Sequence, residues 1–278
     1  MLTPEVVAQV RALAAAVAAA DGEQPLNEDA TLALSAEAGV DHHLEYAEVL
    51  IGYAQSNPRH GTAQLFVHPE HRRRGVGTQL LGAVGTLPVW AFGDLSEAHL
   101  FAVANGRSER RRLLIMQRPL DPPGAAVDPA IRPFDPTTDA EQLLELNAEA
   151  FAWHPEQGQF SRSDLDTRLA EDWYDPAGFL VSTDDEGLTG FHWTKRHPDG
   201  RGEVYILATH PRAQGTGLGK RLLTAGLNHL AAAGAPTVHL YVEASNSRAV
   251  ELYDRAGFAV VHSDVLYGPQ PEPAQEST

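Results

Sequence analysis

A glycine-rich segment near residue 215 carries the clearest chemical signal in the sequence. Gln214–Gly219 contains three glycines and follows an apolar, partly β-branched stretch at Val204–Leu207 that ends at Pro211. Leucines then recur at helical spacing from Leu223 to Leu230. A strand, a glycine turn and a helix in this order let backbone N–H groups converge on an anion at the helix N-terminus. The segment therefore predicts a phosphate-binding loop.

Two better-known phosphate loops do not fit this spacing. A P-loop requires a glycine where Gln214 stands and a hydroxyl side chain where Arg221 stands, so its Mg²⁺ ligand is missing. A dinucleotide fingerprint requires Gly-x-Gly-x-x-Gly, whereas this loop has Gly-x-Gly-x-Gly. The pattern that remains is Gln214-x-x-Gly217-x-Gly219.

The same pattern occurs twice. Arg72-x-x-Gly75-x-Gly77 also follows a His-Pro pair, and about 140 residues separate the two copies. This separation is the size of a domain and is too long for a solenoid repeat. The sequence therefore predicts two similar domains in tandem.

Composition limits the possible functions. The chain has 278 residues, 43% of them hydrophobic, which is enough for two ordinary cores. It has no cysteine, which excludes disulfides, thiolate metal sites and a cysteine nucleophile. Its net charge of −16 disfavours nucleic-acid binding, and no apolar run approaches the ~20 residues of a membrane span. With no basic start typical of a signal peptide, we expect a cytoplasmic monomer that binds neither nucleic acid nor a membrane.

Periodicity and capping residues predict the elements that position the loops. In the first half they predict helices at 3–20, 27–38, 77–84 and 95–105 and strands at 44–46, 48–54, 62–67, 88–92 and 113–117. In the second half they predict strands at 130–134, 178–182, 188–195, 204–207, 237–242 and 258–265, a helix ending near 151, and helices at 161–173 and 245–256. The predicted domains are 1–118 and 130–267, joined by a proline-rich linker at 119–129 and followed by a disordered tail at 268–278.

These motifs resemble those of the GCN5-related N-acetyltransferases. In that family an Arg/Gln-x-x-Gly-x-Gly/Ala loop holds the pyrophosphate of coenzyme A, and Asn246–Phe258 is similar to the Asn-x-x-Ala-x-x-x-Tyr-x-x-x-Gly-Phe pattern that closes its fold. The resemblance implies an α/β fold of two tandem domains, each with a mixed, mostly antiparallel sheet flanked by helices. It also implies acetyl-CoA as cosubstrate, a small-molecule amine as acceptor, and no metal. The family usually begins with a strand, for which the first domain leaves little room. Asp41-His42-His43 invites a metal interpretation, but without a matching ligand cluster we interpret it as a surface turn.

Two residues are candidates for proton transfer. Acetyl transfer to an amine requires a neutral amine, a stabilised oxyanion and a proton for the departing thiolate. Glu203, at the start of the strand that leads into the loop, is the candidate base, although a charged residue is ordinarily solvent-facing. Tyr253 is the candidate acid, because a phenol keeps its proton at neutral pH. In the first domain Gly61 and Ala102 occupy these two positions, so we expect that copy to bind coenzyme A weakly or structurally, without catalysis.

More narrowly, the chain resembles a tandem subfamily that acetylates the cysteinyl amine of cysteinyl-glucosaminyl-inositol. The resemblance rests on His154–Gly158, Gly190–Lys195, Gly202–Tyr205 and Leu240–Glu243. It implies that four charged residues bind the acceptor by charge-assisted hydrogen bonds, namely Glu28, Glu156, Lys195 and Glu203. The implied cofactor site comprises Leu207, Ala208, Thr209, Gln214, Gly215, Thr216, Gly217, Leu218, Gly219, Lys220, Tyr241, Asn246, Ser247, Arg248, Ala249, Val250 and Glu251. A second cofactor site in the first domain comprises Leu65, Phe66, Val67, Arg73, Arg74, Gly75, Val76, Gly77 and Thr78.

Two alternatives remain open at this stage. One is an acetyltransferase of the same architecture for another small amine or a protein N-terminus, which a groove too narrow for a sugar pair would favour. The other is a non-catalytic acyl-CoA sensor. The presence of both Glu203 and Tyr253 in the second copy argues against the sensor.

Overall fold

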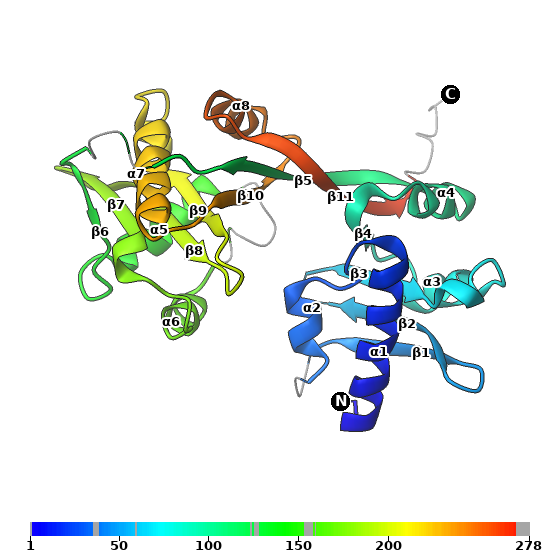
Figure 1. Ribbon diagram of the computed structural model, residues 1–278. Helices are drawn as coiled ribbons and strands as arrows, with labels where there is room; N and C mark the ends of the chain where they lie inside the picture. Colours follow the sequence, from blue (N-terminus) through cyan, green and yellow to red (C-terminus); the bar gives the residue numbers. More distant parts are fainter. Residues whose placement is uncertain are drawn as a thin grey trace, which may run out of the picture. The chain divides into compact units, whose positions relative to one another are not determined.

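Two α/β units make up the chain, and one of them combines both ends of the sequence (Figure 1). The computed structural model describes residues 2–35, 39–58, 60–122, 124, 128–152, 158 and 160–270. The first unit contains the residues up to Leu113 together with those from His262 onward, and the second contains Leu114–Val261. The bounds of these packing units differ from those of the two repeated sequence domains, 1–118 and 130–267. The domain bounds stay a prediction.

The first unit begins with a helix. α1 (Pro4–Asp21) starts at the cap residue Thr3 with proline in its first turn, and α2 (Glu28–Ala33) starts at the cap residue Asn27. Both helices pack against the core that contains Tyr53. In the described part of the chain no strand precedes α1, as the short stretch before this helix predicted.

The rest of the first unit alternates strands and helices. Its elements are β1 (Asp41–Tyr46), β2 (Leu50–Asn57), β3 (Thr62–Val67), η1 (Pro69–His71), α3 (Val76–Val84), β4 (Val89–Ala91), η2 (Phe92–Asp94), α4 (Ser96–Ala104) and the first part of β5 (Arg107–Pro119). The sheet order is β1-β2-β3-β4-β11. The predicted surface turn at residues 41–43 is wrong, because these residues begin β1, and His42 Nδ1 is hydrogen-bonded to the Tyr53 hydroxyl at 2.6 Å.

The second unit has an edge strand, β6 (Ile131–Pro133), before its first helix. Its elements are β6 (Ile131–Pro133), α5 (Ala140–Ala150), α6 (Arg162–Leu169), η4 (Pro176–Gly178), β7 (Phe179–Asp184), β8 (Gly187–Arg196), β9 (Gly202–Thr209), η5 (Pro211–Ala213), α7 (Leu218–Ala232), β10 (Thr237–Glu243), α8 (Ser247–Arg255) and the start of β11 (Ala259–Pro269). The sheet order is β5-β10-β9-β8-β7-β6, with β6 to β9 antiparallel and β9 parallel to β10. α6 is shorter than the predicted 161–173 and begins at a capping box of Ser161 and Asp164.

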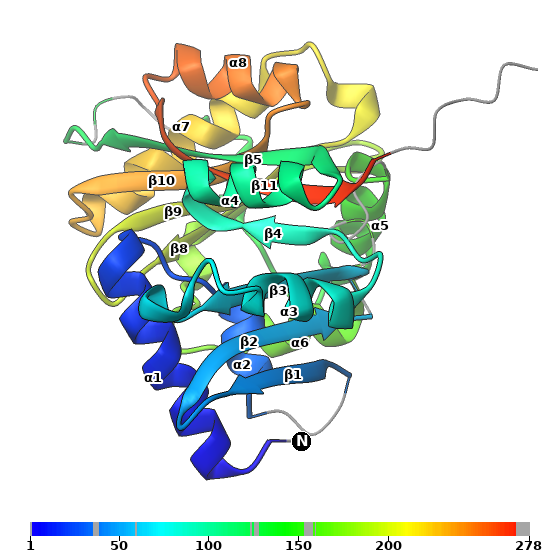
Figure 2. The same cartoon turned by 90° about the vertical axis from the view of Figure 1, so that its right-hand side faces the viewer.

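Helices cover both faces of the second sheet. Val181, Trp193 and Ile206 form one core cluster with α5 and α6. Val204 lies on the other face, in a cluster with α7 and α8, which lie side by side in Figure 2. The sheet therefore separates two layers, and each site residue can be assigned to one of them.

The closing strands are exchanged between the units. The sequence predicted that 113–117 closes the first sheet and 258–265 the second, and this pairing is wrong. β11 instead pairs antiparallel with β4, with Val265 opposite Ala91 and Tyr267 opposite Val89, while β5 continues from Leu114 into the second sheet beside β10. Strand periodicity reveals that a strand exists and not which strand it pairs with.

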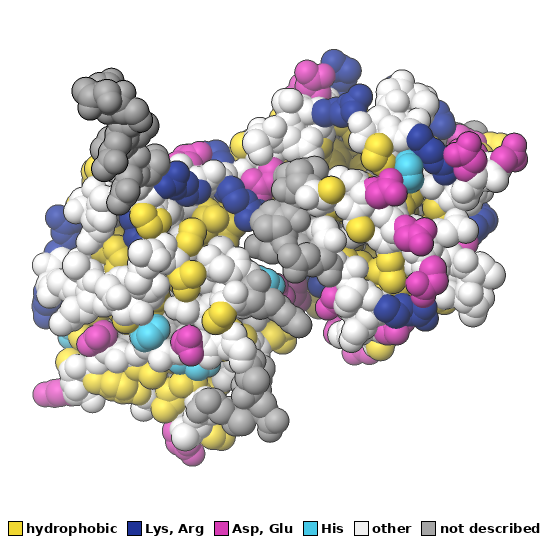
Figure 3. Space-filling view, turned by 180° about the vertical axis from the view of Figure 1, so that it is seen from behind, with side chains coloured by type: hydrophobic (Ala, Val, Ile, Leu, Met, Phe, Trp, Pro, Cys, Tyr) yellow, Lys and Arg dark blue, Asp and Glu magenta, His cyan; other side chains and the backbone are white. Residues whose placement is uncertain are grey.

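Charged side chains of both signs are scattered over the face of the molecule drawn in Figure 3. The sequence has 37 acidic and 21 Lys or Arg residues, and the face drawn in Figure 3 shows the two kinds interspersed. None of the helices in the described part of the chain has the length and apolar character that crossing a membrane requires.

Gly226 in α7 allows the helix to lie close to β8. An added Cβ would overlap the ring of His192, which is fully buried and bonds through Nδ1 to the Leu222 carbonyl at 2.8 Å. Burial lowers the pKa of His192 to about 4, so the ring is neutral and Nδ1 is the donor. We expect Gly226→Ala to lower the free energy of unfolding by about 1–3 kcal/mol, measured by urea denaturation. At Gly82 in α3, where an added Cβ meets nothing within 4 Å, alanine should be neutral or stabilise by up to ~1 kcal/mol; equal losses at both positions would contradict this account.

Candidate active site

The second glycine loop forms the N-terminus of α7. Gly215 and Gly217 have φ angles of 81° and 78°, in the left-handed region that glycine favours, and Gly217 is the N-cap residue of the helix. The first N–H groups of α7 have no partner within the helix. They can therefore bind an anion, with the helix dipole contributing to the attraction.

The first glycine loop has the same backbone path. Arg73 and Gly75 have φ angles of 61° and 87°, matching the second loop, although arginine in the left-handed region costs about 1–2 kcal/mol. A histidine, His68 or His210, caps the short helix before each loop through Nδ1. Arg72 is bound by two 2.8 Å hydrogen bonds to the carboxylate of Asp21. The sequence repeat is thus also a repeat of backbone conformation, and Arg72 of the first loop is paired with Asp21 of the same unit.

The residues of the second predicted cofactor site are divided between core and surface. Phe66, Val67 and Val76 are buried, Leu65 and Gly77 are half-buried, and Arg73, Arg74, Gly75 and Thr78 are exposed. Their role in binding a cofactor stays a prediction.

β9 and β10 pair over only two residues of each strand. Gly202 lies opposite Val238 and Glu203 opposite His239, after which the two strands no longer pair. The other edge of β9 remains paired with β8 up to Thr209. The strands therefore open a gap, and the free edge of β9 can pair with an extended ligand that carries amides.

A cavity of about 1110 Å³ lies within the second unit at this gap. It is lined by most of the predicted cofactor residues: Leu207, Ala208, Thr209, Gln214, Gly215, Gly217, Leu218, Gly219, Lys220, Asn246, Arg248, Ala249 and Glu251. Thr216, Ser247 and Val250 belong to the same segments but do not line it. Arg248 Nη1 donates to Gln214 Oε1 at 2.5 Å, which connects α8 to the glycine loop.

Sequence reasoning missed part of the cavity wall. Arg118 and residues 120–122 and 124 line it, although the sequence assigned Arg118 to the first domain and the other residues to a linker. Arg255 also lines the cavity, so two further cations border it. The available signal was a basic residue, Arg118, near the end of β5. Arg118 donates to the Ala256 carbonyl just after α8, and this contact depends on β5 continuing into the second sheet.

Tyr253 lies on the cavity wall. It is 7% exposed, belongs to α8, and packs edge-on against Phe258 with ring centroids 5.7 Å apart. Burial raises the pKa of Tyr253 above its ordinary value, since the charged phenolate is disfavoured in an apolar environment. The residue is therefore a neutral phenol that can donate a proton into the cavity.

Glu203 lies on the opposite face of the sheet. Its neighbour Val204 shares a core cluster with Tyr253, so the alternation of the strand directs Glu203 to the other side. Lys195 is its direct cross-strand partner in β8, and its Nζ lies 4.8 Å from the ring centre of Trp173 on that side. The structure thus brings Glu203 and Lys195 together on the face of the sheet opposite Tyr253, and Glu203 forms the last β9–β10 pair before the gap.

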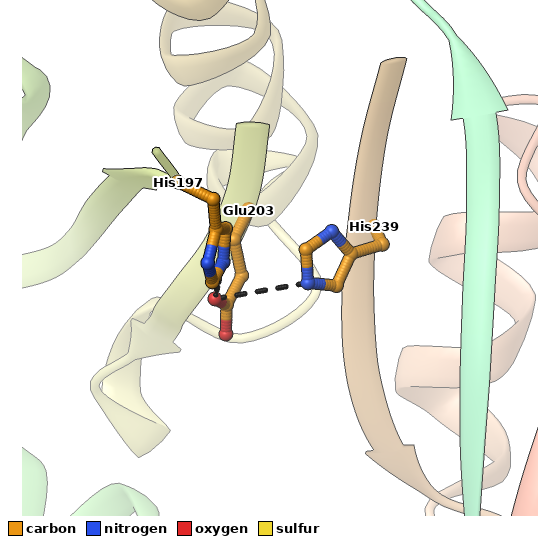
Figure 4. Close-up of side chains that lie close together, drawn as sticks. All are labelled: His197, Glu203 and His239. Carbon is orange, nitrogen blue, oxygen red and sulfur yellow. Dashed lines mark hydrogen bonds and ion pairs between the residues drawn. The ribbon is translucent and has the colours of Figure 1, made fainter. Parts of the chain in front are cut away.

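Two histidines flank the Glu203 carboxylate (Figure 4). His197 Nε2 lies 2.6 Å and His239 Nε2 3.8 Å from Glu203 Oε2. Glu203 and His239 are 7% and 5% exposed, and burial lowers the pKa of His239. Neither histidine was identified from the sequence. For His239 the available signal was its place between Val238 and Leu240 in an alternating strand, and the sequence around His197 offered no such signal.

The same three side chains are ligand types that zinc accepts. Their candidate ligand atoms lie within 4.8 Å of one another. A tetrahedral shell would space the ligand atoms roughly 3.3 Å apart. The uneven distances of 2.6 and 3.8 Å fit a hydrogen-bonded carboxylate better.

The roles of three further predicted contact residues are not tested by the structure. Tyr241 lies on the face of Glu203, 51% exposed and edge-on to the His239 ring at 5.8 Å, and it does not line the cavity. Glu28 is exposed at the start of α2 in the first unit. Glu156 lies outside the described residues. The roles of all three stay predictions.

Comparisons with known proteins agree with this geometry. Residues 141–258 match the acetyltransferase (GNAT) family and residues 39–107 an acetyltransferase (GNAT) domain. Two solved structures share the fold over nearly the whole chain. A GCN5-related N-acetyltransferase from Sphaerobacter thermophilus has a TM-score of 0.73 at 24% identity, covering 98% of this chain and 95% of that one. A tandem GNAT protein from the clavulanic acid biosynthesis pathway has a TM-score of 0.70 at 19% identity, covering 97% and 96%.

The fold and the two glycine loops define a tandem acetyltransferase of the GNAT class, which confirms the predicted fold class. Among curated relatives, the mycothiol acetyltransferase of Thermomonospora curvata is 45% identical over 286 residues, covering 97% of this chain and 96% of the relative. That of Streptomyces avermitilis is 44% identical over 288 residues, covering 96% and 92%. This chain belongs to the mycothiol acetyltransferase family.

Proposed function

We propose that the chain transfers the acetyl group of acetyl-CoA to the cysteinyl amine of cysteinyl-glucosaminyl-inositol. The observation that carries the proposal is the arrangement around the β9–β10 gap. The glycine loop and Tyr253 lie on the cavity side, and Glu203 and Lys195 lie on the other. Two substrates can therefore approach one reaction centre from opposite faces of the sheet.

The cavity fits acetyl-CoA in its chemistry. The N-terminus of α7 provides backbone donors for the pyrophosphate, and Lys220 adds a positive charge beside them. The unpaired edge of β9 at Leu207–Thr209 provides donors and acceptors for the pantetheine amides. The thioester then lies at the gap, between Tyr253 and Glu203.

The two candidate residues account for the protons of the reaction. Glu203 takes a proton from the ammonium group, and the neutral nitrogen attacks the thioester carbonyl, forming the C–N bond. The C–S bond breaks as the tetrahedral intermediate collapses, and Tyr253 donates its proton to the thiolate. The amine loses its second proton, which restores Tyr253, so one proton in total leaves with the products.

The face that holds Glu203 suits a polyol carrying an ammonium group. Lys195 can donate to sugar hydroxyls, and its cation–π contacts with Trp173 and Tyr205, at 4.8 and 5.4 Å, hold it in place. Acceptor contacts by Glu156 and Glu28 belong to this proposal as well.

The first unit has the loop without the proton-transfer pair. Ala102 is the seventh residue of α4 as Tyr253 is of α8, and each nine-residue helix is followed by a left-handed glycine, Gly106 or Gly257. Gly61, in the turn just before β3, is the first-unit counterpart of Glu203, which is the second residue of β9. We infer that the first unit does not catalyse acetyl transfer.

The direct test supplies acetyl-CoA and the cysteinyl pseudodisaccharide and follows the N-acetylated product by mass spectrometry. The same acceptor with its amine already blocked is the control, because it keeps the thiol and the sugars. Turnover of the free amine alone is the expected result. No turnover of it, together with acetylation of another small amine or a peptide N-terminus, would contradict the assigned acceptor and favour the broader acetyltransferase.

The glycine loop provides a prediction about the cofactor. Gly217→Ala forces a side chain into the left-handed region at the first donors of α7, so we expect KM for acetyl-CoA to rise about tenfold through weakened hydrogen bonds to the charged pyrophosphate. Gly234, just after the other end of α7, has a φ of 81°, and neither position has an atom closer than 3.8 Å to an added Cβ. Gly234→Ala should therefore show the same backbone strain with KM unchanged. A similar KM for both variants would contradict the assignment of the loop.

A further inference from the structure

The Glu203 carboxylate is held from one side by a histidine that the reaction described above does not use. His197 Nε2 lies 2.6 Å from Oε2, and the side chain of Glu203 is only 9% exposed. Since an ionised carboxylate can only accept, Nε2 is assigned as the donor. This is a charge-assisted hydrogen bond, which is short and stronger than a neutral one.

The backbone fixes His197 in place. It follows the last residue of β8, and its N–H donates to the Arg201 carbonyl at 2.9 Å, while its own carbonyl accepts from Gly200 N–H at 2.9 Å. Asp199 Oδ2 accepts from Arg201 Nε at 2.7 Å within the same turn. The imidazole is therefore presented by a closed hairpin and not by a loose loop, and one of its nitrogens reaches the carboxylate.

We propose that His197 is a positioning residue for the base Glu203: it holds Oε2 so that the other oxygen faces the amine and takes its proton. The proposal rests on the proposed acetyl transfer and deepens it. No covalent bond to His197 forms or breaks. Its contribution is to fix the rotamer of Glu203 and to stabilise the ionised carboxylate before the amine binds.

Of the two histidines beside Glu203, His197 is the one within hydrogen-bond distance of the carboxylate. His239 lies on the other side of the same oxygen, but its Nε2 is 3.8 Å away, beyond hydrogen-bond distance. Its Nδ1 is buried without a partner among the described residues. Of the other charged groups near the pair, Lys195 faces Glu203 across β8 and β9. Asp199 and Arg201 lie in the hairpin turn and act on the two histidines through their charges.

The role has a measurable consequence in the pH dependence. Without the donor the ionised carboxylate is less stable, so a higher pH is needed to form the active base. For His197→Ala we therefore expect the acidic limb of kcat/KM for the acceptor to move to higher pH and kcat to fall on the order of tenfold, with KM for acetyl-CoA unchanged. His197→Gln can place an amide donor near the position of Nε2, and it should recover most of the loss.

The experiment compares wild type, His197→Ala, His197→Gln and His229→Ala in pH profiles of acetyl transfer, with circular dichroism to check folding. His229 is the matched control, because it bonds to Asp175 through Nε2 at 2.8 Å in the same unit and does not line the cavity. A wild-type enzyme that turns over while His197→Ala keeps its rate and pH profile would overturn the inference. A glutamine variant as impaired as alanine would also overturn it. Activity lost in EDTA and restored by zinc would overturn it as well, by showing that the three side chains bind a metal. Absence of wild-type turnover with any amine would instead count against the proposed function.

Discussion

Replacing Glu203 by glutamine should lower kcat/KM for the amine acceptor by about 10²–10⁴-fold while the affinity for acetyl-CoA stays the same. The amide has nearly the shape of the carboxylate but cannot take the proton of the ammonium group. Glu203 does not line the cavity that contains the glycine loop, so the cofactor should bind the variant normally. Steady-state kinetics with each substrate varied in turn, together with calorimetric titration of acetyl-CoA, measures both quantities.

A control separates this effect from a general loss of charge. Glu186 is exposed in the turn between β7 and β8 of the same unit, and its carboxylate lies 3.4 Å from Arg212. Glu186→Gln should leave kcat/KM within about twofold, since a surface ion pair contributes little. If Glu203→Gln were as active as this control, Glu203 would not be the base and another group would have to deprotonate the amine.

The sequence was sufficient where a function depends on consecutive residues. The strand, glycine turn and helix around Gly217 are local, and the left-handed angles that the turn needs are those glycine adopts without cost. The repeat of this segment at Gly75 was enough to predict two similar domains, and the family comparison confirms them. The helix starts predicted at residues 3, 27 and 161 are local in the same way, and the structure has Thr3, Asn27 and Ser161 as the cap residues there.

The sequence was insufficient where a site depends on which segments meet. Strand alternation predicted β5 and β11 but not their exchange, and through it the place of Arg118 on the cavity wall. The β9–β8 register shifts by one residue at Tyr205, because Trp193 lies opposite Ile206 and Thr194 opposite Val204. Alternation counted along the sequence alone would place Glu203 and Leu207 on the same face of the sheet. The register shift places them on opposite faces, with Leu207 packed against the cluster of Val204. His197 and His239 come from different strand ends and meet only through the parallel pairing of β9 with β10.

Tyr253→Phe should lower kcat by about tenfold to a hundredfold. The phenyl ring fills the same space against Phe258, so the fold and the cavity stay intact, and only the proton for the departing thiolate is lost. The expected loss is smaller than for Glu203→Gln. Thiols titrate near ~8.5, so a thiolate can leave without first receiving a proton, whereas an ammonium group cannot attack the thioester until it has lost one. Single-turnover measurement of acetyl transfer at saturating acetyl-CoA isolates this step from product release.

The pH dependence provides a second measurement on Tyr253. Burial raises its pKa above the ordinary value of ~10, so the phenol keeps its proton across neutral and mildly alkaline pH. The wild-type rate should therefore not decline between about pH 8 and 10 through this residue. Tyr267, a buried phenol of the first unit whose pKa burial also raises, is the matched control, and Tyr267→Phe should leave the rate unchanged. A wild-type decline centred below about pH 9 that disappears in Tyr253→Phe would show that the phenol ionises early, and the assigned acid would then be wrong.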